Sequence, residues 1–285
     1  MSQLGPKIGF IGAGNMGSAL IGAVIQSQLY RQEDVYAFDV DPGRSAAIGR
    51  ETGVGMLKSS ADLFAVCDIV VLAVKPQQMS AVLTEITRDA RFVKKSRTLV
   101  VSIAAGYPIR KIETILYAGL DDHQAGNLPI IRVMPNTPAL VLAAMSGMSA
   151  NRFADSGDVS RTRSLLEAAG RVLEFEEDQL DAVTALSGSG PAYVFYLIEA
   201  MIEAGIRLGL NADEATVATV TTFKGAIRLL EQTAETPQQL RRKVTSPGGT
   251  TAAALAVLES REFKAAVVEA IAAAAKRATE LSATS

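Results

Sequence analysis

The run Gly12-Ala13-Gly14-Asn15-Met16-Gly17 constrains the fold of this 285-residue chain more than any other feature. It follows a short apolar stretch, Lys7 to Ile11, and a helical pattern begins at Asn15. In that context the first glycine permits a tight turn, the second lets a pyrophosphate approach the backbone, and the third lets the helix pack on the strand. Free N–H groups at the helix start would contact the phosphates. The sequence therefore predicts a Rossmann domain that holds a nicotinamide cofactor on Gly12, Gly14, Asn15, Met16 and Gly17.

Short β-rich runs alternate with helical patterns up to about residue 175. Continuous apolar strands separated by helices are typical of a parallel sheet that is covered on both faces. The expected strands are Ile8–Ile11, Val35–Phe38, Ile69–Val74, Thr98–Ile103 and Ile130–Met134. The sequence thus predicts an α/β fold, with a Rossmann domain over residues 1–176 and an all-α domain over residues 177–285.

The second half of the chain has the period of amphipathic helices. Apolar residues recur at steps of three and four from Val194 to Ile202. A second helix is expected to begin at Asn211, with a capping box to Glu214. An Ala-rich helix is expected over residues 263–281. A small monomeric helical domain is one interpretation. We favour a helical interface with a second subunit, because so much apolar surface needs a partner.

The end of the second expected strand bears on the choice between NADH and NADPH. Asp39 stands 22 positions after Gly17, about where an acid would bind the ribose 2′-hydroxyl, and Asp41 follows. Two carboxylates would repel a 2′-phosphate, whereas Arg44 could pair with one. An alternative for Asp41 and Arg44 is helix-start chemistry around Pro42-Gly43. The sequence leaves the cofactor as NADP(H) or NAD(H).

Other candidate cofactor contacts follow the later strands, because ligands bind at the carboxyl ends of strands in such sheets. These residues are Ala73, Val74, Lys75 and Pro76 after one strand, Ala104, Ala105 and Gly106 after the next, and Asn136 between two prolines after the last. Pro135 and Pro138 could merely end a strand, but the amide of Asn136 would then stand at the edge of the cleft.

A second candidate site lies in the helical half, in the segment from Val244 to Thr251. Its turn residues lead directly into an Ala-rich helix. Backbone N–H groups at that helix start, together with the hydroxyls of Ser246, Thr250 and Thr251, would form a compact anion pocket around Gly248 and Gly249. The alternative is a helix cap without a ligand.

Several blocks of the sequence resemble the pyrroline-5-carboxylate reductase family, and the resemblance covers nearly the whole chain. The blocks are GFIGAGNMGSAL at 9–20, LAVKPQ at 72–77, MPNTPA at 134–139, ALSGSGPAYVF at 185–195 and LRRKVTSPGGTTAAALAVLE at 240–259. The last block is the signature of the family. The resemblance implies NAD(P)H-dependent reduction of 1-pyrroline-5-carboxylate to L-proline, the final step of proline biosynthesis.

The family's properties give further expectations. The helical domain would form an intertwined homodimer, often assembled into a decamer. The loop of Ser246, Gly248, Gly249, Thr250 and Thr251 would bind the substrate carboxylate, with Thr251 as the hydrogen-bond or proton donor to the ring nitrogen. Ser60 occupies a position that is often Asn in relatives and approaches the cofactor ribose.

Some positions depart from the family pattern. Leu142 and Ala144 stand where relatives usually carry glycine, which puts substrate contacts there in doubt. Asp39 and Asp41 replace the small polar residues that are frequent in members preferring NADPH, so relaxed or NAD-leaning specificity is open.

Composition and single residues exclude other classes. With 28 Lys+Arg against 30 Asp+Glu and a net charge of -2, the chain shows no sign of a nucleic-acid partner. The most apolar helical stretch, Ala192 to Leu210, is interrupted by Glu199, Glu203 and Arg207, so no membrane span is expected. One cysteine, Cys67, fits a reducing compartment, and we expect a cytoplasmic protein without a metal site.

Two alternative functions remain at this point. One is reduction of another cyclic imine or oxidation of a β-hydroxyacid on the same two-domain plan. Hydroxyacid dehydrogenases commonly use a lysine at the start of a long second-domain helix, where this chain reads Ser187-Gly188-Ser189-Gly190-Pro191. The other is a non-enzymatic sensor or scaffold that only binds the cofactor.

Overall fold

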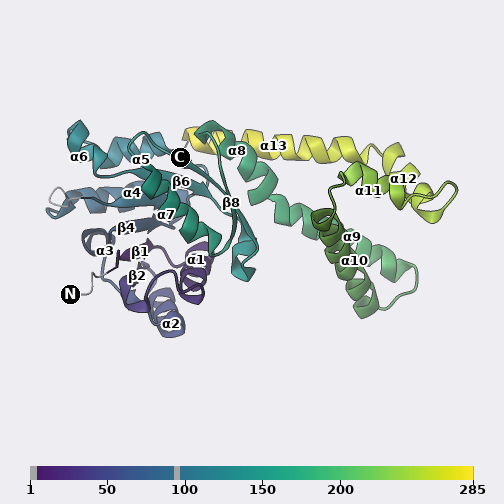
Figure 1. Ribbon diagram of the computed structural model, residues 1–285, viewed down its shortest axis with the longest axis horizontal. Coiled ribbons are helices and arrows are strands. Elements are labelled where there is room, and N and C mark those ends of the chain that lie inside the picture. Colours follow the sequence, from purple (N-terminus) through teal and green to yellow (C-terminus); the bar gives the residue numbers. More distant parts are fainter. Residues whose placement is uncertain (1–4, 93–96, 285) are drawn as a thin grey trace. The chain divides into compact units, whose positions relative to one another are not determined.

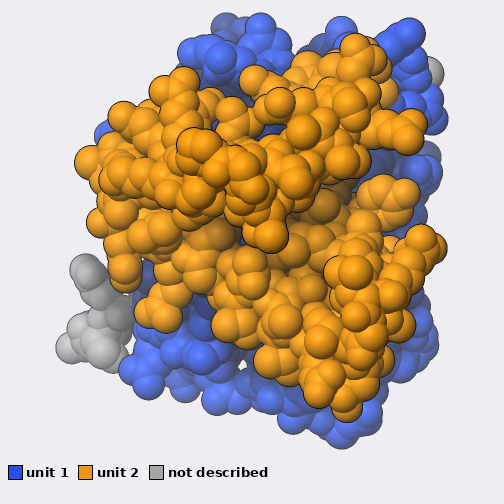
Figure 2. Space-filling view, turned by 90° about the vertical axis from the view of Figure 1, so that its right-hand side faces the viewer, with its two compact units in different colours: residues 1–189, 274–285 blue, residues 190–273 orange. Residues whose placement is uncertain are grey.

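The computed structural model describes residues 5–92 and 97–284. The chain divides into two compact units, one formed by residues 1–189 and 274–285 and the other by residues 190–273 (Figure 2). This division rests on contacts within the folded chain, whereas the domain boundary expected at residues 176/177 rests on the change of sequence pattern. The expected boundary therefore stays a prediction.

The first unit is built on a twisted sheet (Figure 1). Its strands have the order β3-β2-β1-β4-β5-β6-β7-β8 among the described residues. Pairing is parallel from β3 to β6, antiparallel between β6 and β7, and parallel between β7 and β8. The strands are β1 (Ile8–Ile11), β2 (Val35–Phe38), β3 (Gly55–Met56), β4 (Ile69–Leu72), β5 (Leu99–Ser102), β6 (Ile130–Met134), β7 (Ala144–Ala150) and β8 (Gly170–Glu174).

Helices cover both faces of this sheet, as the continuous apolar strands predicted. One hydrophobic core joins the sheet to α1, α2 and α7, and a second core joins the opposite face to α3, α4 and α5. The alternation of the strands produces both cores: Val71 belongs to the first and its neighbour Val70 to the second. The helices are α1 (Asn15–Gln26), α2 (Pro42–Thr52), α3 (Ser60–Val66), α4 (Pro76–Arg88), α5 (Ile109–Leu116), α6 (Asp122–Gly126), α7 (Ser156–Glu167) and α8 (Leu180–Val183).

The sheet is mainly parallel, as expected, and one antiparallel strand, β7, lies toward its far edge. Each of the five expected strands is present, with ends that differ by at most two residues. The antiparallel strand β7 was missed because its sequence, AMSGMSA, is rich in small residues and has no β-branched side chain. Pairing with the exposed edge of β6, which no local pattern records, makes this segment a strand.

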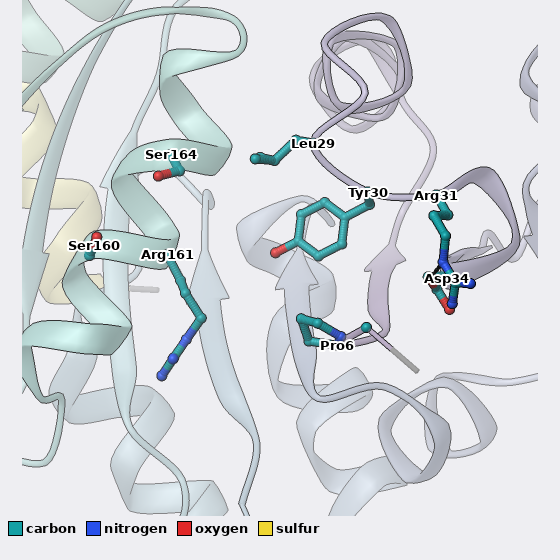
Figure 3. A pocket seen from close by; sticks show the side chains of 9 residues that line it. Pro6, Leu29, Tyr30, Arg31, Asp34, Ser160, Arg161 and Ser164 are labelled. Atoms are coloured by element: carbon teal, nitrogen blue, oxygen red, sulfur yellow. Dashed lines mark hydrogen bonds and ion pairs between the residues drawn. The ribbon is translucent and has the colours of Figure 1, made fainter. Parts of the chain in front are cut away.

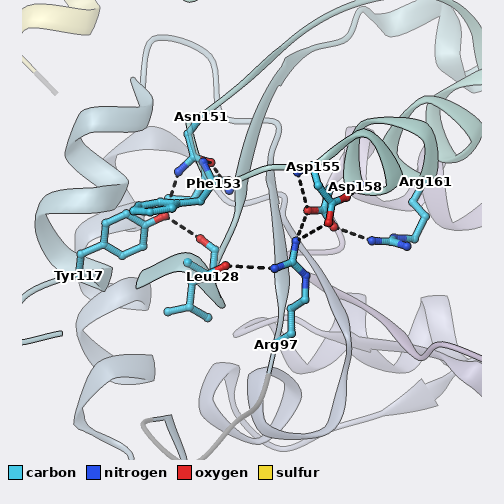
Figure 4. A network of polar contacts seen from close by, with 10 residues as sticks. Arg97, Tyr117, Leu128, Asn151, Phe153, Asp155, Asp158 and Arg161 are labelled. Atoms are coloured by element: carbon cyan, nitrogen blue, oxygen red, sulfur yellow. Dashed lines mark hydrogen bonds and ion pairs between the residues drawn. The ribbon is translucent and has the colours of Figure 1, made fainter. Parts of the chain in front are cut away.

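A network of polar contacts fixes α7 against the start of β5 (Figure 4). The Asp155 and Asp158 side chains form a capping box at the start of α7. Asp158 is fully buried and accepts hydrogen bonds from Arg97, at 2.5 Å, and from Arg161, at 2.6 Å. Two guanidinium groups thus compensate the buried carboxylate, which otherwise would be costly to bury.

The second unit is helical. It contains α9 (Gly190–Arg207), α10 (Ala212–Gln232), α11 (Pro237–Lys243), α12 (Thr250–Ser260) and the first part of α13 (Phe263–Thr284). The capping box between Asn211 and Glu214 is confirmed. The helix expected to end at residue 281 continues to Thr284, and its last turns belong to the first unit, where Thr279 Oγ1 donates to Asp181 Oδ2 at 2.9 Å.

The apolar faces of these helices are largely uncovered in the single chain. Val194 and Met201, from the expected apolar stripe of α9, and Val217 and Ile227 of α10 are 40–66% exposed. Exposed large apolar side chains on neighbouring helices mark interaction surfaces in soluble proteins. Among the described residues, no helix is both long and apolar enough to cross a membrane.

Candidate active site

The glycine loop joins β1 to α1. At two of its positions, only glycine fits. Gly12 has a φ of +103°, and a Cβ there would lie 2.7 Å from the carbonyl oxygen of Ala73. A Cβ on Gly17 would collide with the carbonyl oxygen of Gly12. The first glycine therefore makes the turn and the third allows α1 to pack on β1, as the sequence predicted.

The loop leaves donors available at the start of α1. Gly14 is the N-cap residue, and no side chain caps this helix end. The first N–H groups of a helix have no intrahelical partner, and they carry the positive end of the helix dipole. Gly14, Asn15 and Met16 all border a cavity. This arrangement suits a pyrophosphate.

That cavity, which we call the nucleotide pocket, has a volume of about 890 Å³ and lies along the carboxyl ends of β1, β2, β4 and β5. Most of the predicted cofactor residues line it. They are Gly12, Gly14, Asn15, Met16, Asp39, Arg44, Ser60, Ala73, Val74, Lys75, Pro76, Ala104 and Ala105. The predicted residues Gly17, Asp41, Gly106 and Asn136 are not part of its lining.

Asp41 and Asn136 are engaged elsewhere. Asp41 is the N-cap of α2, and hydrogen bonds from the backbone N–H groups of Arg44 and Gly43 lower the pKa of its carboxyl. Asn136 donates from Nδ2 to the backbone oxygen and Oγ of Ser187, both at 3.2 Å, and its Oδ1 accepts the N–H of Met145 at 2.9 Å. Its amide thus fastens β7 and the segment before α9.

Gly17 and Gly106 have packing roles. Gly17 is in the first turn of α1, where a Cβ would collide with the glycine loop. Gly106 has a φ of +69°, and a Cβ there would lie 3.3 Å from the Cβ of Leu281 in α13. Both positions shape the surroundings of the nucleotide pocket without lining it.

One side of the nucleotide pocket was missed by sequence reasoning. It is formed by one face of α4, which carries Gln78, Ala81, Val82 and Glu85, together with Gln77. These residues follow the spacing i, i+3, i+4 and i+7 from a helix that begins directly after β4, so helical periodicity could have found them. Other residues missed in the lining are Ile11, Phe38, Val40 and Ile103.

Ser60 is the most suggestive polar group in the nucleotide pocket. It is 1% exposed, and its Oγ has no hydrogen-bond partner among the residues that the structure describes. A buried hydroxyl without a partner is costly, so its position in the pocket lining points to a ligand that would bind it.

The second candidate site is the loop of residues 245–251 in the helical unit, here called the substrate loop. Gly248 has a φ of +71°, and the N–H of Gly249 donates to the carbonyl oxygen of Ser246 at 3.0 Å. Helix α12 begins at Thr250 without a side-chain cap. The hydroxyls of Ser246, Thr250 and Thr251 make no hydrogen bond within the described chain. The alternative of a simple helix cap is therefore not supported.

Another cavity, of about 540 Å³, lies at a different part of the first unit (Figure 3). It is lined by residues of the segment after α1 and of α7, including Tyr30, Arg31 and Arg161. Burial raises the pKa of Tyr30, and the charge of Arg161 opposes that shift. None of its lining residues belongs to the glycine loop or to the carboxyl end of a strand. It therefore lacks the features of a dinucleotide site.

No group of His, Cys, Asp and Glu that could hold a metal ion occurs within residues 5–92 and 97–284. The two candidate sites offer backbone N–H groups and hydroxyls, and the nucleotide pocket adds the charged side chains of Asp39, Arg44, Lys75 and Glu85.

Two known families match different parts of the chain. Residues 7–106 match the family described as NADP oxidoreductase coenzyme F420-dependent, and residues 177–281 match pyrroline-5-carboxylate reductase dimerisation. The predicted Rossmann domain followed by a helical domain is thus confirmed. The second match also indicates that the protein forms a homo-oligomer.

Individual relatives cover nearly the whole chain. A pyrroline-5-carboxylate reductase of Pseudomonas aeruginosa is 40% identical over 97% of both chains. The structure of the Coxiella burnetii enzyme matches with a TM-score of 0.86 and 35% identity, covering 97% of this chain and 98% of that one. The Plasmodium falciparum enzyme, solved with NADP bound, matches with a TM-score of 0.85 and 31% identity over 99% and 100% of the two chains. This chain therefore belongs to the pyrroline-5-carboxylate reductase family.

Proposed function

We propose that this protein catalyses the NAD(P)H-dependent reduction of 1-pyrroline-5-carboxylate to L-proline, the final step of proline biosynthesis. The observation that carries the proposal is the presence, in one chain, of a pocket suited to a dinucleotide and of a loop suited to a small carboxylate. Relatives with 35–40% identity over nearly their full length bear the name of this reductase.

The cofactor would be NADH or NADPH in the nucleotide pocket. The residues that would hold it are Gly12, Gly14, Asn15, Met16, Ser60, Ala73, Val74, Lys75, Pro76, Ala104 and Ala105, with Arg44 in the first turn of α2. When bound, the nicotinamide supplies the hydride. The N–H groups at the start of α1 would bind its pyrophosphate, and the hydroxyl of Ser60 would gain a partner on the ribose.

The substrate loop would bind the carboxylate of the imine. Ser246, Thr250 and Thr251 bring unengaged hydroxyls, and Gly248 and Gly249 let the backbone approach the ligand. Negative charge would build on the ring nitrogen as the hydride reaches the carbon, so a donor at that nitrogen lowers the barrier. We assign this donor to Thr251. Positioning and one donor are a large part of the catalysis in such a site.

The assembly would be a homodimer formed through the helical unit, and a decamer is the further assembly that the family suggests. The exposed apolar faces of α9 and α10 support the dimer. We also propose that the substrate-binding and dimerisation domain starts at residue 177, where the family match starts. Sedimentation equilibrium distinguishes the 30.0 kDa monomer from these assemblies. The cytoplasmic location expected from the sequence stays a prediction.

The activity is tested with the purified full-length chain. We expect NADH or NADPH to be consumed when 1-pyrroline-5-carboxylate is added, with one L-proline formed for each cofactor oxidised. In the reverse direction we expect oxidation of L-proline and thiazolidine-4-carboxylate, and none of β-hydroxyacids. Faster turnover of a β-hydroxyacid would overturn the proposal in favour of the dehydrogenase alternative. Cofactor binding without any turnover would favour a sensor.

Arg44 is expected to influence the ratio of activities with NADPH and NADH. Its side chain is 54% exposed and lies 3.2 Å from Asp41 Oδ2 and 3.6 Å from Asp39 Oδ2. Without this cation, the negative charges of Asp39 and Asp41 beside it would no longer be compensated near the 2′-phosphate. We expect Arg44→Ala to lower the ratio of kcat/KM for NADPH to that for NADH by about tenfold, which is about 1.4 kcal/mol.

The matched control for this prediction is Arg50→Ala. Arg50 is in the last turn of the same helix, α2, and is exposed outside the nucleotide pocket, so its replacement changes the net charge equally. Steady-state kinetics with both cofactors should leave the ratio unchanged in this control. An equal ratio in the wild type and Arg44→Ala would show that Arg44 does not act on the 2′-phosphate.

A further inference from the structure

Asp39 has an unusual environment for an acid at the end of β2. Its carboxylate borders the nucleotide pocket, yet the side chain is only 4% exposed. Oδ2 accepts the N–H of Ala13 in the glycine loop at 2.8 Å, and Oδ1 accepts the N–H of Asp41 at 2.9 Å. One carboxylate therefore joins the loop that precedes α1 to the segment that precedes α2.

A second bond in the same place strengthens this connection. The N–H of Gly12 donates to the carbonyl oxygen of Phe38 at 2.8 Å. Two consecutive N–H groups of the glycine loop are thus bound to the end of β2, one by the backbone and one by Asp39. These bonds fix the orientation of the loop before α1 begins, and so they fix where the N–H groups of α1 point.

The same contacts leave the carboxylate little capacity for a ribose. An acid that selects NADH must accept a hydrogen bond from the ribose 2′-hydroxyl. Each oxygen of Asp39 already accepts a backbone N–H, which uses two of the roughly four acceptor positions of a carboxylate. The other positions are largely covered, because the side chain is only 4% exposed and Arg44 Nη1 lies 3.6 Å from Oδ2. A ribose hydroxyl would have to displace one of these groups or approach an oxygen that is almost completely covered.

We propose that Asp39 is a positioning residue, which holds the glycine loop in its phosphate-binding conformation and does not discriminate NADH from NADPH. This inference rests on the proposed function only in that the nucleotide pocket binds NAD(P)H. The pyrophosphate is common to both cofactors, so a residue that acts through the glycine loop must affect both by the same factor.

Asp39→Asn is the variant that tests this role. An asparagine has one acceptor oxygen and directs its NH₂ group at the second backbone N–H, so one buried donor loses its partner. The loop would then occupy its binding conformation for only part of the time, and the apparent Kd rises as the inverse of that fraction. We expect the Kd values of NADH and NADPH each to rise about tenfold, with their ratio unchanged, and kcat at saturating cofactor to stay within about twofold.

The measurement is a titration of NADH and NADPH by their own fluorescence, without the imine. A weaker Kd for NADH alone would show that Asp39 reads the ribose and would overturn the proposal. Unchanged Kd values with a lower Tm would show a purely structural role and would overturn it too. Asp34→Asn is the control, because Asp34 is a 4% exposed acid outside the nucleotide pocket.

A second measurement uses the wild-type protein, so it does not depend on how Asp39→Asn folds. We expect the N–H groups of Ala13 and Asp41 to be protected from hydrogen exchange in the free protein and to the same extent with NADH or NADPH bound. Rapid exchange of Ala13 in the free protein would contradict the proposal. If the wild-type protein binds no cofactor, the proposed function fails. If it binds the cofactor but does not reduce the imine, the proposed role of Asp39 can still be tested by the binding measurements.

Discussion

Replacing Gly12 with alanine is expected to weaken the binding of NADH and NADPH by at least about 100-fold, equivalent to about 2.7 kcal/mol. Gly12 has a φ of +103°, which side chains rarely adopt, and the new Cβ would lie 2.7 Å and 2.8 Å from the backbone oxygen and carbon of Ala73. These atoms cannot turn aside as a side chain can, so the loop or the end of β4 must move. Either movement displaces the N–H groups that would bind the pyrophosphate.

Gly22→Ala is the matched control for this substitution. Gly22 lies in the interior of α1, and an added Cβ would meet no heavy atom within 4 Å. Alanine there should raise the free energy of unfolding by about 0.5–1 kcal/mol and leave cofactor binding unchanged. Fluorescence titration and thermal unfolding of both variants test the prediction. Wild-type affinity in Gly12→Ala would mean that the glycine loop does not hold the cofactor.

Thr251→Ala is expected to lower kcat for 1-pyrroline-5-carboxylate by roughly 10- to 100-fold, which corresponds to about 1.4–2.7 kcal/mol of transition-state stabilisation. Thr251 is in the first turn of α12, and its hydroxyl makes no hydrogen bond within the described residues. Because the proposed bond strengthens as charge develops on the ring nitrogen, kcat should fall more than the affinity for substrate does.

Two further variants separate the hydroxyl from the shape of the side chain. Thr251→Ser retains the donor and should keep kcat close to that of the wild type, whereas Thr251→Val retains the shape and should be as slow as Thr251→Ala. Single-turnover measurements at saturating cofactor report the hydride step directly. Near wild-type rates in Thr251→Val would exclude Thr251 as the donor, and the reductase assignment would then need a different group at the ring nitrogen.

The expectations that held best are those in which a local requirement leaves one solution. Gly12 and Gly17 were expected at a turn and at a helix–strand contact, and the structure has a positive φ at the first and no space for a Cβ at the second. Likewise, Asn211 and Glu214 form the capping box that their spacing indicated. Backbone conformation and helix capping depend on neighbouring residues, so a sequence records them directly.

The features that the sequence did not indicate depend on distant partners. Asn136 was expected to offer its amide to a cofactor, but Ser187 and Met145, from other parts of the chain, occupy it. Strand β7 has small residues and low β-propensity, and it forms because the edge of β6 is available. Neither partner can be identified by periodicity, since each contact joins segments that the chain brings together only on folding.

The sequence by itself determined the kind of chain this is: glycines after a strand specify a dinucleotide fold, and the Ser246–Thr251 segment carries the family signature. Only the tertiary structure decided how the acids after β2 are used. Asp41 caps α2, and Asp39 is bound to the N–H of Ala13, 26 residues earlier. The physical reason is that a residue type gives a side chain its chemistry, whereas burial and neighbouring donors decide which groups that chemistry can reach.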